Sequence, residues 1–152
     1  MIVRKVKITV LKEPGKVHPE VNILCEEETP EVERLYRHIS QFSKAVTALK
    51  DGREYQVPYN QICYVESVDG KTYIYTKDDV FLSQHSLTGL ESVLSDGSFA
   101  RISKACILNV QELWHVEPYE NHRLRATLRN GEQQIVNRSY INGLKEKVKA
   151  LR

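Results

Sequence analysis

Apolar and polar residues alternate over short stretches through most of the chain after residue 53, a pattern typical of β-strands with one buried face. Turn-forming pairs separate these stretches, because Asp69-Gly70 and Asn130-Gly131 readily take the positive φ angles of tight hairpins. The pattern therefore predicts a mainly β fold. The expected strands are residues 54–57, 62–66, 72–76, 80–82, 112–117, 123–128 and 133–136.

Two stretches in this region have apolar residues at helical spacing instead. Leu87, Leu90 and Leu94 fall on one face of a short helix expected around residues 86–95, and Asp96-Gly97 ends it. A last helix is expected over residues 139–151. Its apolar stripe comprises Ile141, Leu144, Val148 and Leu151.

The first fifty residues carry a different pattern. Residues 3–11 and 21–25 alternate well enough to predict two strands. Thr29 and Pro30 then predict the start of a helix, as N-cap and first helical residue, and this helix is expected to run to about Lys50. We therefore expect a small N-terminal ββα segment over residues 1–50, with a main domain over residues 51–152.

The expected N-terminal helix has a heptad stripe of apolar residues, with steps of four, three, four and three. The stripe contains Leu35, Ile39, Phe42, Val46 and Leu49. Two heptads are too few to specify a coiled coil, so two interpretations remain open. The stripe packs on the two preceding strands, or it joins two copies of the chain in a homodimer.

Composition narrows the class of protein. The chain has 152 residues, 41% of them hydrophobic, and a net charge of +2, which suits a folded domain and neither indicates nor excludes a nucleic-acid partner. Its three cysteines lack the CxxC spacing of zinc sites and are expected to be free thiols. No apolar run reaches the roughly 18 residues of a membrane span, and no signal peptide is present, so we expect a cytoplasmic protein.

Enzyme motifs are absent from the sequence. It has no glycine-rich phosphate loop, no HExxH and no GxSxG motif, and its histidines and carboxylates do not fall at metal-ligand or acid/base spacing. We therefore expect no catalytic site, no metal, no cofactor and no small-molecule substrate.

Cations and hydroxyls interrupt the apolar pattern in two places. Arg101, Ser103 and Lys104 lie within the apolar stretch 100–109, and Asn137-Arg138-Ser139-Tyr140 lies where a strand gives way to the last helix. Such side chains bond phosphates and base edges. We hypothesise that both clusters form one DNA-binding surface with the hairpin at residues 68–72. From spacing alone, ordinary solvated surface cations are the favoured explanation, because isolated cations mostly solvate a surface.

The order of these motifs resembles a known family. From about Arg53 to Arg152 the chain looks like a LytTR-type DNA-binding domain, the output domain of LytR/AlgR-like bacterial transcription regulators. The resemblance rests on Ile62-Cys63-Tyr64-Val65-Glu66-Ser67, on Lys71-Thr72-Tyr73-Ile74-Tyr75-Thr76, on Leu87-Thr88-Gly89-Leu90-Glu91, on Phe99-Ala100-Arg101-Ile102-Ser103-Lys104 with Cys106-Ile107-Leu108-Asn109, and on Asn137-Arg138-Ser139-Tyr140.

This resemblance implies an elongated, mostly β fold with short helices. It also implies that loops from one edge of the domain enter successive major grooves of DNA. Carried over residue by residue, the groove-facing positions are Lys71 or Thr72, Lys104 and Arg138, with Arg101, Ser103, Ser139 and Tyr140 beside them. The implied function is sequence-specific regulation of transcription, with double-stranded DNA as the partner and a homodimer reading paired half-sites. The alternative is a protein-interaction module with the same fold.

The chain departs from the family pattern upstream of this region. Only about fifty residues precede it, too few for a receiver domain, and none of them is an aspartate, so we do not expect phosphorelay control. The N-terminal segment resembles the short extension of stand-alone LytTR regulators. Some relatives of this kind are encoded beside a small integral membrane protein, and such a partner is suggested by analogy alone.

Overall fold

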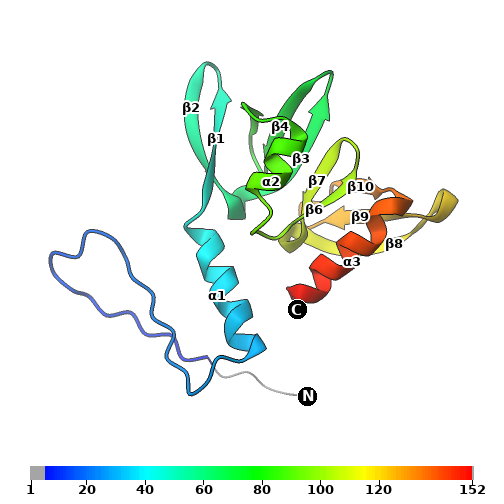
Figure 1. Cartoon of the computed structure of the whole chain (residues 1–152). Coiled ribbons are helices and arrows are strands. Elements are labelled where there is room, and N and C mark those ends of the chain that lie inside the picture. Colours follow the sequence, from blue (N-terminus) through cyan, green and yellow to red (C-terminus); the bar gives the residue numbers. More distant parts are fainter. Residues whose placement is uncertain (1–5, 152) are drawn as a thin grey trace.

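The computed structural model describes residues 6–151, which form two antiparallel sheets and several short helices (Figure 1). The expected mostly β fold is confirmed. The three α-helices are α1 (Pro30–Phe42), α2 (Leu87–Val93) and α3 (Ile141–Ala150). The strands are β1 (Ala45–Lys50), β2 (Arg53–Pro58), β3 (Ile62–Val68), β4 (Lys71–Thr76), β5 (Val80–Ser83), β6 (Phe99–Ser103), β7 (Cys106–Asn109), β8 (Leu113–Tyr119), β9 (Arg123–Leu128) and β10 (Gln133–Val136).

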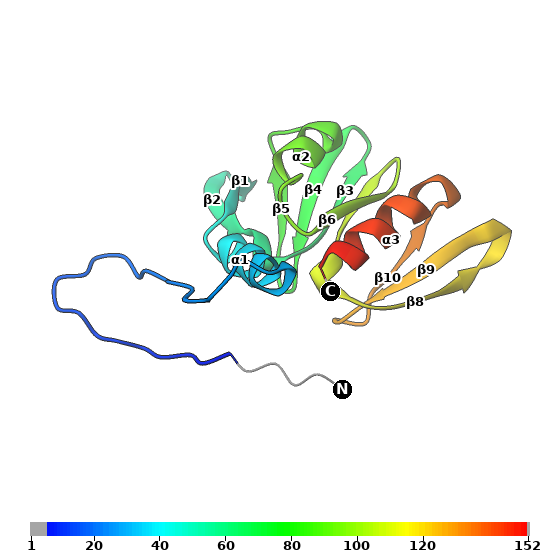
Figure 2. The same ribbon diagram turned by 60° about the horizontal axis from the view of Figure 1, so that its bottom comes forward.

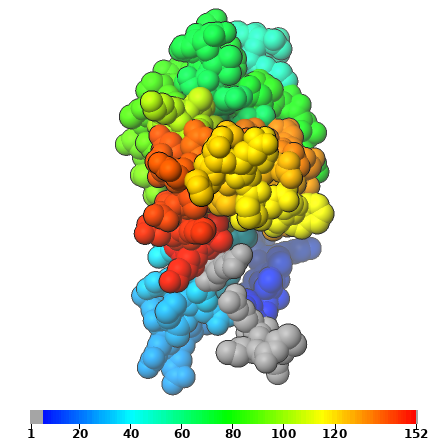
Figure 3. All heavy atoms as spheres, turned by 90° about the vertical axis from the view of Figure 1, so that its right-hand side faces the viewer, coloured from blue at the N-terminus to red at the C-terminus, as the bar shows by residue number. Residues whose placement is uncertain are grey.

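The larger sheet has seven strands in the order β2-β1-β5-β4-β3-β7-β6. The β3–β4 hairpin turns at Asp69-Gly70, where φ is 50° and 78°, as the sequence predicts. Its last paired residues are Val68 and Lys71, so both lie at the tip of the hairpin. The smaller sheet, β10-β9-β8, lies beside the larger one and lengthens the domain (Figure 2). The β8–β9 hairpin extends from this end of the molecule (Figure 3).

Two hydrophobic clusters form the core. The first lies between the larger sheet and α2, whose stripe residues Leu87, Leu90 and Leu94 are buried as the sequence predicts. The second joins the two sheets and α3, with Leu144 only 1% exposed. The two clusters together hold the strands of both sheets and the helices α2 and α3.

The expected ββα structure of residues 1–50 is wrong in the part that the structure describes. Residues 6–29 contain no strand and extend away from the body, and residues 3–5 of the first expected strand lie outside the described range (Figure 1). Apolar alternation alone does not make a strand, because the backbone groups of a strand need a hydrogen-bonded neighbour. Among residues 6–151, no neighbouring strand pairs with residues 6–29.

The N-terminal helix is shorter than expected. It begins as predicted, since the Thr29 hydroxyl accepts a hydrogen bond from the Val32 amide at 3.3 Å, but it ends at Phe42 rather than at Lys50. Residues 45–50 form β1 instead. Asp51 and Gly52 have φ angles of 52° and 74° and form the β1–β2 turn, not a helix end. The heptad stripe is therefore divided between two elements, and the expected domain boundary at residue 51 falls inside a hairpin of the larger sheet.

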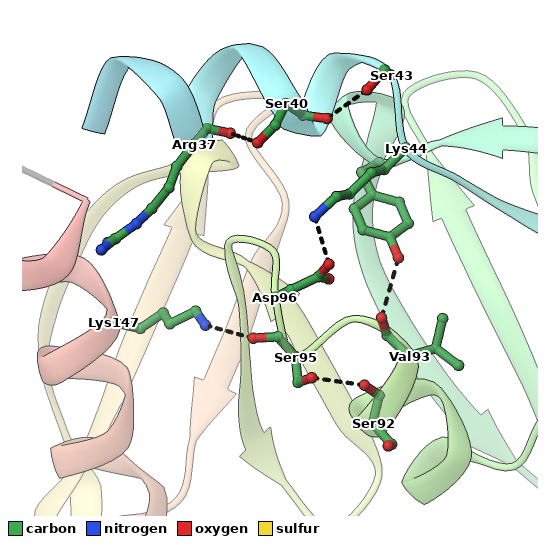
Figure 4. Close-up of polar contacts among 10 residues, drawn as sticks. Arg37, Ser40, Ser43, Lys44, Ser92, Val93, Ser95, Asp96 and Lys147 are labelled. Atoms are coloured by element: carbon green, nitrogen blue, oxygen red, sulfur yellow. Dashed lines mark hydrogen bonds and ion pairs between the residues drawn. The ribbon is translucent and has the colours of Figure 1, made fainter. Parts of the chain in front are cut away.

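Polar contacts position α1 and α3 against the loop that follows α2 (Figure 4). Lys44, just after α1, pairs with Asp96 at 2.5 Å, and the Lys147 ammonium of α3 donates to the Ser95 carbonyl at 3.3 Å. Burial, with help from the nearby Arg37 cation, lowers the pKa of Lys147. These contacts fasten both helices to the same loop.

Candidate nucleic-acid interface

Three loops from distant parts of the sequence lie next to one another in the fold. The Ser67 amide donates to the Ala105 carbonyl at 2.8 Å, which joins the β3–β4 hairpin to the β6–β7 turn. The Asn137 amide donates to the Ile102 carbonyl at 2.9 Å, which joins the segment after β10 to the other side of the same turn. We call residues 68–71, 103–105 and 137–140 the three-loop surface.

The hairpin tip contributes Lys71 to this surface. Lys71 is exposed at the first position of β4, whereas Thr72 is only 5% exposed and faces the sheet interior. The sequence left open which of the two faces a groove. The structure makes Lys71 the one that a nucleic acid can reach.

The β6–β7 turn is held by one of the cations expected to bind DNA. The Arg101 side chain is 18% exposed, and its Nε and Nη2 donate to the carbonyls of Ser103 and Lys104 at 2.8 and 2.6 Å. Its Nη1 lies 3.4 Å from a Glu91 carboxylate oxygen. The Ser103 hydroxyl accepts the Ala105 amide at 3.2 Å. Arg101 and Ser103 thus position the turn, and Lys104 remains exposed at its apex.

The segment after β10 forms a short 3₁₀ turn, Arg138–Tyr140, that leads into α3. The Tyr140 amide donates to the Asn137 carbonyl at 2.9 Å. Arg138 and Ser139 are exposed, whereas Tyr140 packs against the second hydrophobic cluster. The side chains of Arg138 and Ser139 are therefore accessible to a ligand, whereas most of the Tyr140 side chain packs against the core.

A fourth loop adds cations that the sequence did not single out. Arg138 lines a depression of about 710 Å³ together with residues of the β8–β9 turn, among them His122 and Arg123. The Arg123 guanidinium lies 5.1 Å above the Tyr119 ring, which holds it beside this depression. Arg123 and Arg125 are two residues apart on β9, and this spacing places both on one face of the strand. The same spacing is the sequence signal by which they could have been identified.

The thiol nearest the three-loop surface is not reactive. Cys106 begins β7 directly behind the turn, and burial raises its pKa to about 12, with the nearby Glu66 carboxylate adding to the effect. Cys63 is buried as well, with a pKa raised to about 11. In residues 6–151, no group of histidine, cysteine and carboxylate side chains could hold a metal ion. The same part of the chain has no helix long and apolar enough to cross a membrane.

An antiparallel β domain with cationic hairpin tips on one side suits the class of β proteins that bind nucleic acids through loops. A sequence model of the LytTr DNA-binding domain matches residues 52–149, which is more than half of the chain. The chain therefore belongs to the LytTR family of DNA-binding domains.

Individual relatives and a solved structure agree with this assignment. The chain is 29% identical over 90 residues to the sensory transduction protein LytT of Bacillus anthracis, covering 59% of this chain and 37% of that protein. It is 22% identical over 109 residues to the transcriptional regulatory protein YpdB of Escherichia coli K12, covering 71% of this chain and 45% of that protein. The chain thus spans less than half the length of these relatives.

The fold matches a solved LytTr DNA-binding domain from Bacillus cereus. The TM-score is 0.64 at 25% sequence identity, and the match covers 70% of this chain and 97% of that domain. The expected LytTR-like fold is confirmed by this match.

Proposed function

We propose that the chain is a bacterial transcription regulator that binds specific sequences of double-stranded DNA through its three-loop surface. The observation that carries the proposal is the pair of backbone hydrogen bonds that joins the three loops. Lys71, Lys104 and Arg138 are all exposed on these loops. None of the three forms an ion pair with another described residue. Unpaired cations at adjacent loop tips are what a phosphate backbone and its grooves attract.

Each loop has its own part in binding. Arg138 is the first residue of the 3₁₀ turn that leads into α3, and its planar guanidinium can bond guanine O6 and N7 in a bidentate manner. Lys104 sits at the apex of a turn that Arg101 fixes from inside, so it meets DNA without first paying the entropy of ordering a loop. Lys71 and the Ser139 hydroxyl lie at the flanks, where phosphate contacts set the register of the complex.

A homodimer is part of the proposal. Regulators that recognise paired half-sites hold two copies of the reading domain at a fixed spacing on the duplex. The net charge of only +2 is compatible with DNA binding, because the attraction to phosphate depends on where the cations lie on the surface and not on their total number.

The test is a selection of duplexes from a random-sequence library with the full chain, followed by binding measurements across a salt series. We expect enrichment of a defined sequence, together with a loss of affinity of about a thousandfold or more between 50 and 200 mM salt if six or more phosphates are contacted. A chain that enriches no duplex would contradict the proposal and favour a protein-interaction module.

A charge reversal checks that the three-loop surface is the part that binds. Lys104→Glu should abolish binding to the selected duplex, because it places a carboxylate against phosphate. Lys77→Glu is the matched control, since Lys77 is also exposed but follows the opposite end of β4 from the hairpin tip. Equal losses in both variants would show that only overall charge matters.

A further inference from the structure

A groove without any partner runs along β8, away from the three-loop surface. It has a volume of about 710 Å³ and lies between β8, α3 and the side chain of His38 on α1. Trp114 and Val116 on β8 are 66% and 43% exposed beside it. The other apolar residues that line it are Val110, Leu113, Leu124, Leu144, Val148 and Leu151. An exposed tryptophan in an apolar groove marks an interaction site more often than a solvated surface.

The groove follows a free strand edge. β8 pairs with β9 on one side, and among residues 6–151 no strand pairs with its other side. The four consecutive residues 113–116 all line the groove, and the register of β8 against β9 shifts between Leu113 and His115, so the groove follows the strand over this irregular stretch. Pro118 lacks an amide hydrogen, so the edge that can accept another strand is residues 113–117.

The charged residues that line the groove indicate what kind of segment can bind in it. Arg129, Lys145 and Lys149 line it, and no carboxylate does within the part of the chain that the structure describes. A suitable occupant is therefore an extended segment with apolar side chains for the groove floor and carboxylates for this cationic rim.

This chain carries such a segment in its own N-terminal arm. Residues 21–25, Val-Asn-Ile-Leu-Cys, have the composition of a strand but pair with nothing, and Val21 and Leu24 are 64% and 94% exposed. Glu26, Glu27 and Glu28 follow immediately. The five residues 21–25 match the length of the edge at residues 113–117.

We propose that residues 21–28 of a second copy of this chain form an added strand on β8 and fill the groove. An antiparallel arrangement places Cys25 opposite Leu113, the first residue of β8. The glutamates then pass Arg129, which follows the residue paired with Leu113. Two copies exchange arms reciprocally, so one self-complementary contact serves both and the assembly closes as a dimer.

The arm of the same chain is placed unfavourably for this contact. From the start of α1, residues 6–29 extend to the side opposite β8 in both views of the ribbon, although α1 itself borders the groove through His38 (Figures 1 and 2). A second copy meets no such restriction. The proposal names the interface of the proposed homodimer, and its tests use no DNA, so it can fail while DNA binding through the three-loop surface stands.

The first test uses Trp114, the only tryptophan of the chain, as its reporter. In the full chain, its emission should shift to shorter wavelength as protein concentration rises, in step with dimer formation followed by light scattering. Leu24→Asp should keep the protein monomeric and the emission unshifted. Leu11→Asp is the matched control, because Leu11 is 86% exposed on the same arm but lies outside residues 21–28, and it should behave like the wild type.

Three outcomes of this test would overturn the proposal. A blue-shifted emission in a monomer at every concentration would mean that the arm folds back on its own chain. A dimer whose Trp114 emission does not move would mean that another surface is the interface. Equal effects of Leu24→Asp and Leu11→Asp would mean that residues 21–28 have no special part.

A second test uses the exposed native thiol of Cys25. The wild-type chain is mixed with a tagged variant carrying Cys25→Ser and Leu113→Cys, under mild oxidation. A disulfide between the two different chains is expected, because Leu113 lies opposite Cys25 in the proposed register, and replacing Leu113→Cys by Gln84→Cys, an exposed position on another part of the domain, should abolish it. Equal cross-linking at both positions would contradict the docking of the arm on β8.

Discussion

Arg138 is the single residue on which sequence recognition is expected to depend most. The Arg138→Ala variant should lose about 1–3 kcal/mol of binding to the selected duplex, the usual cost of losing a good base contact. Its affinity for scrambled DNA should fall much less. Titration of both duplexes at one salt concentration measures the difference, and equal small losses on both would limit Arg138 to a phosphate contact.

Cys106 gives the domain a dependence on alkaline pH. Its pKa is raised to about 12 in the folded state, whereas an unfolded thiol ionises near pH ~8.5. Because the pKa of the thiol is higher in the folded state, its contribution to the free energy of unfolding is complete below the unfolded pKa. That contribution is lost as the pH rises from the unfolded pKa toward the folded pKa. Raising the pH from 8.5 to 10 should therefore lower the free energy of unfolding by about 2 kcal/mol through the ionisation of Cys106.

Urea unfolding of the wild type and of Cys106→Ala at both pH values measures this contribution. The variant is expected to be less stable at pH 7, because a buried side chain is truncated, but to lose less stability as the pH rises. Parallel pH profiles would show that Cys106 does not titrate as its burial implies.

The cations on the three-loop surface could be found from the sequence, but their separate roles could not. Lys104 and Arg101 look alike as cations in one stretch. Only the fold reveals that the Arg101 guanidinium is engaged by two carbonyls of its own turn, while Lys104 projects from the apex. Thr72 illustrates the same limit, because burial decides which of two adjacent residues reaches the surface.

At the scale of elements, the side chain of Asn109, the last residue of β7, connects this strand to neighbouring segments of the core. This buried side chain accepts the Ser98 hydroxyl at 2.7 Å and the Gln111 amide at 3.1 Å, and it donates to the Ile62 carbonyl at 2.7 Å. Asn109→Ala removes this partner from the Gln111 amide and the Ile62 carbonyl, while the Ser98 hydroxyl keeps Gln41 as an acceptor at 3.0 Å. The change should lower the free energy of unfolding by roughly 1–3 kcal/mol for each group that stays unpaired.

Chemical denaturation of Asn109→Ala measures the loss, and Gln111→Ala is the control, because Gln111 is less buried and its backbone amide remains. Similar stability of the two variants would mean that water replaces the Asn109 contacts. From the sequence, Asn109 is visible only as part of a family motif. Its role as a junction residue depends on three segments that the fold brings together.

The strands and hairpins of the main domain follow from local sequence, and the N-terminal elements do not. Asp69-Gly70 and Asp51-Gly52 are the same dipeptide, and both are compatible with a hairpin or with a helix end. Residues 45–50 suited the end of an apolar helical stripe as well as they suited a strand. Pairing with β2 and β5 decides in favour of the strand, and that pairing is not encoded within the segment itself.

For the whole molecule, the arrangement of the loops is what converts scattered cations into one surface. Their convergence depends on hydrogen bonds between residues far apart in sequence, such as Ser67 with Ala105 and Asn137 with Ile102. Composition gives no sign of this, because 22 basic and 20 acidic residues nearly cancel. The attraction to DNA that we propose for this surface therefore depends on the fold, and the sequence-specific binding should be lost on unfolding.

The most direct test of the three-loop surface is a dimethyl sulfate footprint of the selected duplex, which reports guanine N7 in the major groove. We predict protected guanines in successive major grooves, about one helical turn or 10–10.5 base pairs apart. Arg138→Ala should lose protection in one groove and keep it in the next, where Lys104 binds. A footprint that is unchanged in both Arg138→Ala and Lys104→Ala would contradict the account, because it would show that another part of the domain reads the DNA.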